Sequence, residues 1–228
     1  MKKTVVMAMT GLSMMLSSCG GGSNTQTPAA TSQSTDNFTY EVDAFADLQI
    51  LRYQVPEFES LTLKQKEMIY YLSQAAIEGR DILFDQNNKY NLAIRRTLEA
   101  IYENYKGDKS DKDYQEFEVY LKRVWFSNGI HHHYGEEKFL PAFSVEFFEK
   151  QVKELPADKV PVKTGQSVDD FLAMIKPVMF DAKVMLKKVN QASGVDLIQT
   201  SANNYYGEGV TQKDVEAFYA KMKNPNDS

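Results

Sequence analysis

The feature that most limits the fold of this chain is a pattern that recurs from Thr62 onward. A helix-capping side chain is followed by apolar residues three and four positions apart, which places those residues on one face of a helix. Thr62 with Gln65 and Ser167 with Asp170 have the sequence of a capping box. Further helix starts are indicated at Ser110–Asp113, Ser144 and Thr211, and a further apolar stretch runs from Ile94 to Tyr105. The sequence therefore predicts a mainly α fold with a few short strands, in the α+β class.

Breaking residues predict where these helices end. The Asn128-Gly129 pair suits the left-handed residue that closes a helix, and Pro156 should close the helix that begins at Ser144. Pro177 should kink the helix that follows Ser167 or divide it into two. Strand propensity is weaker, and we expect one strand within residues 48–55 and an extended segment at 196–206.

The N-terminus has the character of an export signal. A charged start is followed by an apolar run, Val5–Leu16, and by small residues before Cys19. Leu-Ser-Ser-Cys resembles the bacterial lipobox, so we expect a signal peptide at 1–18, lipid attachment at Cys19 and a flexible tether at 19–37. The folded part is expected at 38–228. An ordinary signal with a chance cysteine is the alternative.

This interpretation places the protein in the cell envelope, anchored to a membrane, with the outer membrane favoured. The sequence leaves open whether it faces the periplasm or the exterior. Removal of the signal leaves 24 basic against 31 acidic residues, a net charge of about −7, which opposes nucleic-acid binding. Membrane attachment would rest on the lipid, and the single cysteine allows no internal disulfide.

The three histidines of the chain are consecutive and lie just before two adjacent glutamates. They are His131, His132 and His133, followed by Glu136 and Glu137. Successive side chains diverge in a strand and lie about 100° apart in a helix, so neighbouring histidines make a poor zinc chelate. His133 with either glutamate would supply two ligands. We expect a loop without a physiological metal, although adjacent imidazoles bind nickel or copper adventitiously.

Other catalytic signatures are missing from the sequence. It has no Gly-x-Ser-x-Gly elbow, no phosphate-binding loop and no dinucleotide fingerprint. The adjacent acids Asp169 and Asp170 fit a helix N-terminus. The residues alone therefore predict an exported, mainly helical lipoprotein domain and do not indicate its task. A small metal-dependent hydrolase centred on the histidines would need further ligands.

Four separated stretches give the chain a family resemblance. They are YYLSQAAIEG at 70–79, YQEFEVY at 114–120, Ser127-Asn128-Gly129 with its continuation to Pro141, and NNYYGEGVT at 203–211. In order and approximate spacing they resemble the N-terminal region of the dipeptidyl peptidase III family. The resemblance extends over about 48–222 and would make this a bacterial lipoprotein member.

The resemblance implies a zinc metallo-exopeptidase that releases dipeptides from the N-termini of short peptides. Two lobes close over a cleft, and this chain would form part of the lower lobe. In the family, a helix with His-Glu, three further residues and His holds the zinc, together with a glutamate from a later Glu-Glu motif. No histidine follows His133 here. No catalytic or metal residue therefore carries over, and we expect the chain alone to bind no zinc and to be inactive.

Two hypotheses remain for the chain as a whole. The first is an N-terminal fragment of such a peptidase, whose partner would be the missing C-terminal part and whose parent enzyme would act on short peptides. It predicts apolar surface left unburied, especially on the helices after Ser167. The alternative is a standalone lipid-anchored peptide-binding or scaffold module with a self-contained core.

Overall fold

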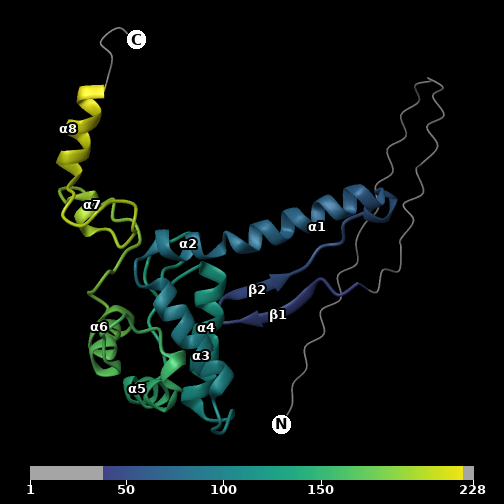
Figure 1. The fold of residues 1–228 in the computed structure, drawn as a ribbon, viewed down its shortest axis with the longest axis horizontal. Helices are drawn as coiled ribbons and strands as arrows, with labels where there is room; N and C mark the ends of the chain where they lie inside the picture. The colour runs from purple at the N-terminus through teal and green to yellow at the C-terminus, as the bar shows by residue number, and fades with distance from the viewer. Residues whose placement is uncertain (1–37, 223–228) are drawn as a thin grey trace, which may run out of the picture. The chain divides into compact units, whose positions relative to one another are not determined.

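The computed structural model describes residues 38–222 and confirms the mainly α prediction, with a single two-stranded sheet in that range (Figure 1). The predicted signal at 1–18, the lipid site Cys19 and the tether at 19–37 lie outside the described residues. The strands are β1 (Glu41–Phe45) and β2 (Leu48–Leu51), and the helices are α1 (Leu63–Glu78), α2 (Arg80–Asn87), α3 (Asn91–Asn104), α4 (Lys112–Ser127), α5 (Val145–Glu154), α6 (Val168–Phe180), α7 (Leu197–Thr200) and α8 (Gln212–Met222). Short 3-10 turns lie at Phe58–Ser60 and Ala157–Lys159.

The hydrophobic core lies among α3, α4, α5 and α6, which stand together in Figure 1. Most apolar positions predicted on α3 and α4 are buried, with Tyr102 and Trp125 as exposed exceptions, and the inward faces of α5 and α6 are buried as well. Much of this core is aromatic: Phe117, Phe143 and Phe147 contact one another, with ring centroids 5.7 to 6.0 Å apart. Aromatic pairs at such distances add to the stability gained from buried area.

The predicted helix starts are confirmed by their capping hydrogen bonds. Thr62 and Ser167 each take part in a complete capping box. Ser144 caps α5, and the Thr211 hydroxyl accepts the Asp214 amide. At α4 the capping residue is Asp111, whose carboxylate accepts the amides of the next turn. These bonds satisfy amides that have no partner within their own helix.

The ends of the helices agree with the sequence in part. Asn128 adopts the left-handed conformation after α4, with φ 53°, and α5 stops just before Pro156. Of the two outcomes expected at Pro177, a kink or a division, the division is wrong, because α6 continues through Pro177 to Phe180 and no helix follows directly. A proline in the last turn removes only one backbone hydrogen bond of the helix.

The N-terminal hairpin pairs antiparallel, with Phe45 opposite Leu48 and Ala44 opposite Gln49. The predicted early strand is therefore confirmed at Leu48–Leu51, although Tyr53 and Val55 lie outside it. The hairpin contacts α4 through two ion pairs: Lys122 Nζ lies 2.9 Å from Asp43 Oδ2, and Arg123 bonds Asp47.

The extended segment predicted at 196–206 is wrong for its first part. Residues 197–200 form the short helix α7, because the Asp196 carboxylate accepts the amides of Ile198 and Gln199, both at 2.9 Å. A carboxylate in this position favours the start of a helix, because it accepts amides that have no partner within the helix. The short helix α2 was not predicted from the sequence; it begins directly after Gly79, the residue that ends α1.

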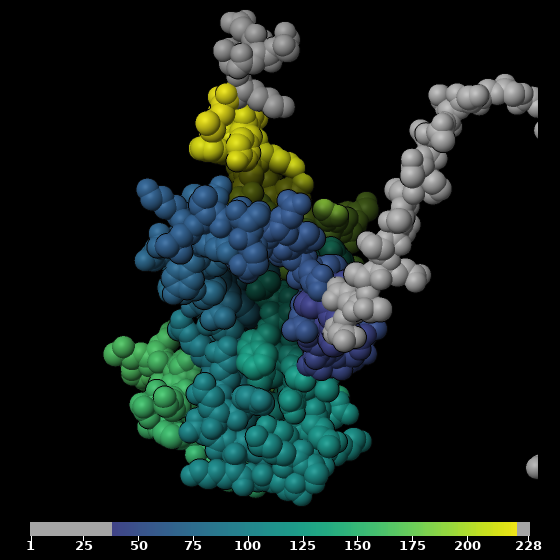
Figure 2. All heavy atoms as spheres, turned by 90° about the vertical axis from the view of Figure 1, so that its right-hand side faces the viewer, coloured from purple at the N-terminus to yellow at the C-terminus, as the bar shows by residue number. Residues whose placement is uncertain are grey.

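The distribution of uncovered apolar surface agrees with the prediction only in part. It was expected mainly after Ser167, but α6 is well buried and contributes five residues to the core. Uncovered apolar surface does lie on α8, which follows Ser167, but it also lies on α1, which precedes it; neither helix has a buried residue. Figure 2 shows α1, in blue, at the surface of the face it draws. Among residues 38–222, no helix is both long and apolar enough to cross a membrane.

Candidate functional site

The histidine run forms a tight loop after α4. Gly129 has φ 142°, and a β-carbon there would lie 2.1 Å from the Asn91 side-chain nitrogen, so only glycine fits. The next amide, of Ile130, donates to Asn91 Oδ1 at 3.2 Å. His131 then pairs across the loop with Lys138 in an isolated antiparallel bridge. The loop predicted from the flanking glycines is confirmed, and its base is anchored to α3.

His131 is buried, with 2% of its surface exposed. Its Nε2 lies 2.7 Å from the Met185 carbonyl oxygen, and since a carbonyl only accepts, Nε2 carries the proton. Nδ1 is then the unprotonated nitrogen, and it is buried with no hydrogen-bond partner in the part of the chain that the structure describes. Burial lowers the pKa of His131 from 6.5 to about 4. The imidazole is therefore neutral at pH 7.

His132 and His133 lie outside this buried position and stack on each other, with ring centroids 4.4 Å apart. His132 Nδ1 accepts the amides of Tyr134 at 3.2 Å and Gly135 at 2.8 Å, so its proton sits on Nε2. His133 packs edge-on against Phe126. Burial, and then the neighbouring His132, lower the pKa of His133.

The two glutamates pair with lysines that follow α6. Glu136 Oε1 lies 3.4 Å from Lys188 Nζ, and Glu137 Oε1 lies 3.5 Å from Lys187 Nζ. These contacts join the histidine loop to residues 185–188, as do the backbone bonds from Lys138 to Leu186 and from Lys188 to Glu136. The carboxylates therefore help to hold two loops together.

The loop does not fit a zinc ion. A ligating imidazole needs an unprotonated nitrogen that faces the metal. The free nitrogen of His131 is enclosed in protein and that of His132 accepts two amides, which leaves one imidazole of the three. Among residues 38–222, no three histidine, cysteine, aspartate or glutamate side chains are grouped so as to hold a metal.

Lys138 performs a role that the sequence did not indicate. Its ammonium is buried and donates to the carbonyl oxygens of Val178 at 3.1 Å, Val184 at 2.5 Å and Asp181. These carbonyls lie at and just beyond the end of α6, where backbone oxygens lack helical partners. Burial lowers the pKa of Lys138. Through Lys138 the loop therefore caps the end of α6, which is a structural role.

A cavity with a volume of about 650 Å³ lies beside the end of α3 and the face of α5. Its lining includes the rings of Tyr105 and Phe147 and more acidic than basic side chains: Asp111, Asp113, Glu146 and Glu154 against Lys106 and Lys150. Burial, and then the nearby carboxylates, raise the pKa of Tyr105. Negative charge beside aromatic rings favours a cationic group.

In comparisons with known proteins, no protein-family model and no curated protein matches this chain.

Proposed function

We propose that this chain is the N-terminal part of a dipeptidyl peptidase III-like zinc metallopeptidase, which releases dipeptides from the N-termini of short peptides. Its role in that hydrolase is to build part of the lower lobe. As a bacterial lipoprotein member it would be anchored to the outer membrane through Cys19. The zinc and the catalytic glutamate would be supplied by the C-terminal part of the peptidase, since the His-Glu-x-x-x-His motif is missing from these residues.

The observation that carries this proposal is that the sequence stretches similar to the family lie close together in the structure, around α2 and the start of α3. Asn87 donates from its side chain to the Asn128 carbonyl at 3.0 Å, across 41 positions. The Asn204 amide donates to the Gln86 carbonyl at 2.8 Å, across a much longer separation. These bonds join the 127–129 and 203–211 stretches to the helix that follows 70–79. Landmarks that share one framework support a common structural origin.

The residues of the second landmark support the same interpretation. Tyr114, Phe117 and Tyr120 are all buried, and they pack in the core against α5 and the segment before it. Their similarity to the family therefore concerns packing positions. Packing positions define a lobe and do not take part in the reaction.

The uncovered helices are a further support. Seven large apolar side chains of α1 are exposed: Leu63, Met68, Ile69, Tyr70, Tyr71, Leu72 and Ile77. Extensive exposed apolar surface marks a place where protein, membrane or ligand packs. In the proposed enzyme, that protein would be the rest of the lobe.

The cavity beside α5 favours one alternative, a standalone lipid-anchored module that binds short peptides. Its carboxylates and aromatic rings suit the amino group of a peptide. The two functions differ in what residues 19–228 do alone. The peptidase proposal predicts that they neither bind zinc stoichiometrically nor hydrolyse a dipeptidyl arylamide.

The test uses purified residues 19–228 in three measurements: bound zinc by mass spectrometry, arylamide hydrolysis, and calorimetric titration with a tetrapeptide that has a free N-terminus. No zinc, no hydrolysis and no peptide binding are expected. Stoichiometric zinc with hydrolysis would place the catalytic centre within these residues and contradict the proposal. Peptide binding that is lost in Glu154→Gln, but retained in the exposed control Glu208→Gln, would favour the module.

A further inference from the structure

A small hollow at the junction of α2, α3 and α4 has the features of a docking pocket. It is lined by Arg80, Phe84, Arg95, Glu99 and Trp125, and its volume is about 240 Å³. We call it the Arg95 hollow. Pockets for small ligands usually enclose about 300 to 1,000 Å³, so the Arg95 hollow has room for about one side chain.

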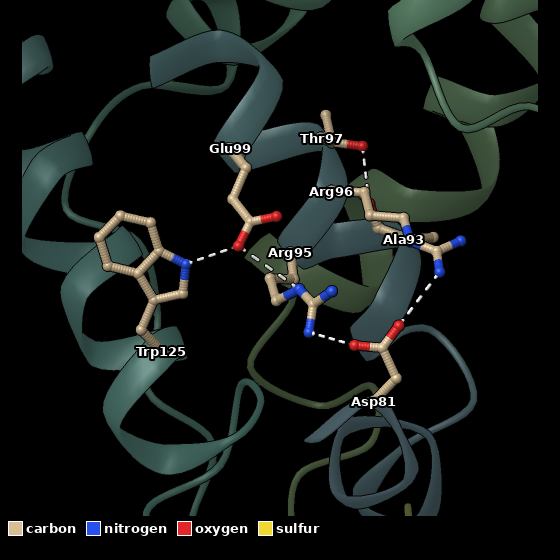
Figure 3. A network of polar contacts seen from close by, with 7 residues as sticks. All are labelled: Asp81, Ala93, Arg95, Arg96, Thr97, Glu99 and Trp125. Atoms are coloured by element: carbon tan, nitrogen blue, oxygen red, sulfur yellow. Dashed lines mark hydrogen bonds and ion pairs between the residues drawn. The ribbon is translucent and has the colours of Figure 1, made fainter. Parts of the chain in front are cut away.

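Arg95 forms the buried wall of the hollow and is 5% exposed. It lies over the Phe84 ring, with its guanidinium carbon 4.6 Å from the ring centroid, and donates to Asp81 Oδ1 at 2.8 Å. Its Nε lies 3.4 Å from Glu99 Oε1, an ion-pair distance that lacks hydrogen-bond geometry. Figure 3 shows Arg95 between these two carboxylates. The guanidinium is thus held rigidly in place.

The charges around the hollow do not balance. Asp81 accepts from Arg95 and also from Arg96, and Glu99 Oε1 accepts the Trp125 indole N–H at 2.9 Å. The Arg80 side chain has no hydrogen bond or ion pair with any other residue of 38–222. Two guanidinium groups line the hollow: Arg95 pairs with Asp81 and Glu99, whereas the exposed Arg80 pairs with neither, so the unmatched positive charge belongs to Arg80. A carboxylate would complement it, since guanidinium and carboxylate form paired hydrogen bonds.

The mouth of the hollow is aromatic. Trp125 is 40% exposed and Tyr102 is 38% exposed, and their rings meet edge to face with centroids 6.1 Å apart. Tryptophan, tyrosine and arginine are the side chains that contribute most to protein–protein affinity, usually around a central pocket. The hollow and its mouth combine all three.

We infer that the Arg95 hollow docks a segment of a partner protein that presents a carboxylate side chain between two apolar side chains. The carboxylate enters beside Arg80 and Arg95, and the apolar side chains pack on Trp125 and Tyr102. This inference stands apart from the proposed peptidase function, because it depends only on the charges and rings at this junction.

The test uses the indole of Trp125, the single tryptophan of the chain, as its reporter. Uniformly ¹⁵N-labelled residues 19–228 are titrated with Ac-Leu-Glu-Leu-NH₂ and with its neutral isostere Ac-Leu-Gln-Leu-NH₂, and the indole N–H cross-peak is followed. We expect a saturable shift with the glutamate peptide and a dissociation constant at least fivefold smaller than that of the glutamine peptide. Higher salt should narrow the difference.

Arg80→Gln should bring the two peptides to equal affinity, because it removes the unpaired guanidinium. The matched control Lys64→Gln makes the same charge change at an exposed position on α1 and should keep the difference. Equal affinities in the unaltered protein, no saturable shift with either peptide, or an Arg80→Gln variant that behaves like the control would each overturn the inference.

Discussion

Acidification between pH 7.5 and pH 4.5 should destabilise this protein mainly through His131. Burial holds the pKa of this imidazole at about 4 in the folded state, against an ordinary value of 6.5. The unfolded chain therefore takes up the proton first as the pH falls. The stabilising contribution is fully present above pH 6.5 and is lost as the pH falls from there toward 4.

The magnitude follows from these two pKa values. Linkage between them gives a loss of about 2.5 kcal/mol in the free energy of unfolding by pH 4.5. Lys138 and Lys188 both lie close enough to His131 to disfavour its charged form, while its bond to the Met185 carbonyl favours that form. Carboxylates with lowered pKa values, such as Asp43 and Asp81, lose their contributions mostly below this window.

Urea unfolding followed by circular dichroism at each pH measures the effect. His131→Gln keeps a donor for the Met185 carbonyl and does not titrate, so its stability should fall by about 2.5 kcal/mol less than that of the unaltered protein over this range. The control His132→Gln keeps His131 and should retain most of the dependence of the unfolding free energy on pH. Equal slopes in the unaltered protein and in His131→Gln would refute the reasoning.

Four further outcomes are expected. Lys138→Met should lower the free energy of unfolding by about 2 to 4 kcal/mol, because it leaves buried carbonyls without a donor. The control Lys187→Met removes an exposed ion pair and should lower it by under about 0.5 kcal/mol. Equal losses in the two variants would contradict the capping role of Lys138. Gly129→Ala should cost over about 2 kcal/mol, against about 1 kcal/mol for Gly165→Ala, since both glycines have positive φ but only Gly129 would clash; thermal unfolding compares them. The double variant Met68→Lys with Leu72→Lys should bind less of a hydrophobic dye and should change the free energy of unfolding by under about 0.5 kcal/mol, whereas Leu98→Ala in the core should lower it by about 2 to 5 kcal/mol. A large loss in the double variant would show that the apolar face of α1 is covered. Cys19→Ser should abolish fatty-acid labelling and release the protein from the membrane fraction, and retention of label would disprove lipid attachment there.

Local signals in the sequence predicted most of the fold. The capping boxes at Thr62 and Ser167 and the left-handed Asn128 were visible because cap chemistry acts within four residues. The apolar spacing of α3 and α4 likewise identified their buried faces. The segment at 196–206 was misjudged because the single carboxylate of Asp196 outweighed the propensities that follow it.

Tertiary contacts explain what the sequence did not reveal. Spacing alone indicated that His131–His133 form a poor chelate, but it did not distinguish the buried His131 from the stacked pair. The carbonyl cage of Lys138 depends on residues 40 to 46 positions away. The apolar face of α1 was predicted from periodicity, but the same periodicity occurs in covered and uncovered helices.

The measurement that tests the peptidase proposal most directly is the sequence of the genomic locus downstream of the Ser228 codon, followed by expression of the frame it encodes. The proposal predicts a continuous frame with a His-Glu-x-x-x-His motif, whose product binds one zinc and releases dipeptides from short peptides. A stop codon followed by unrelated sequence, or a longer product without zinc-dependent dipeptide release, would contradict it.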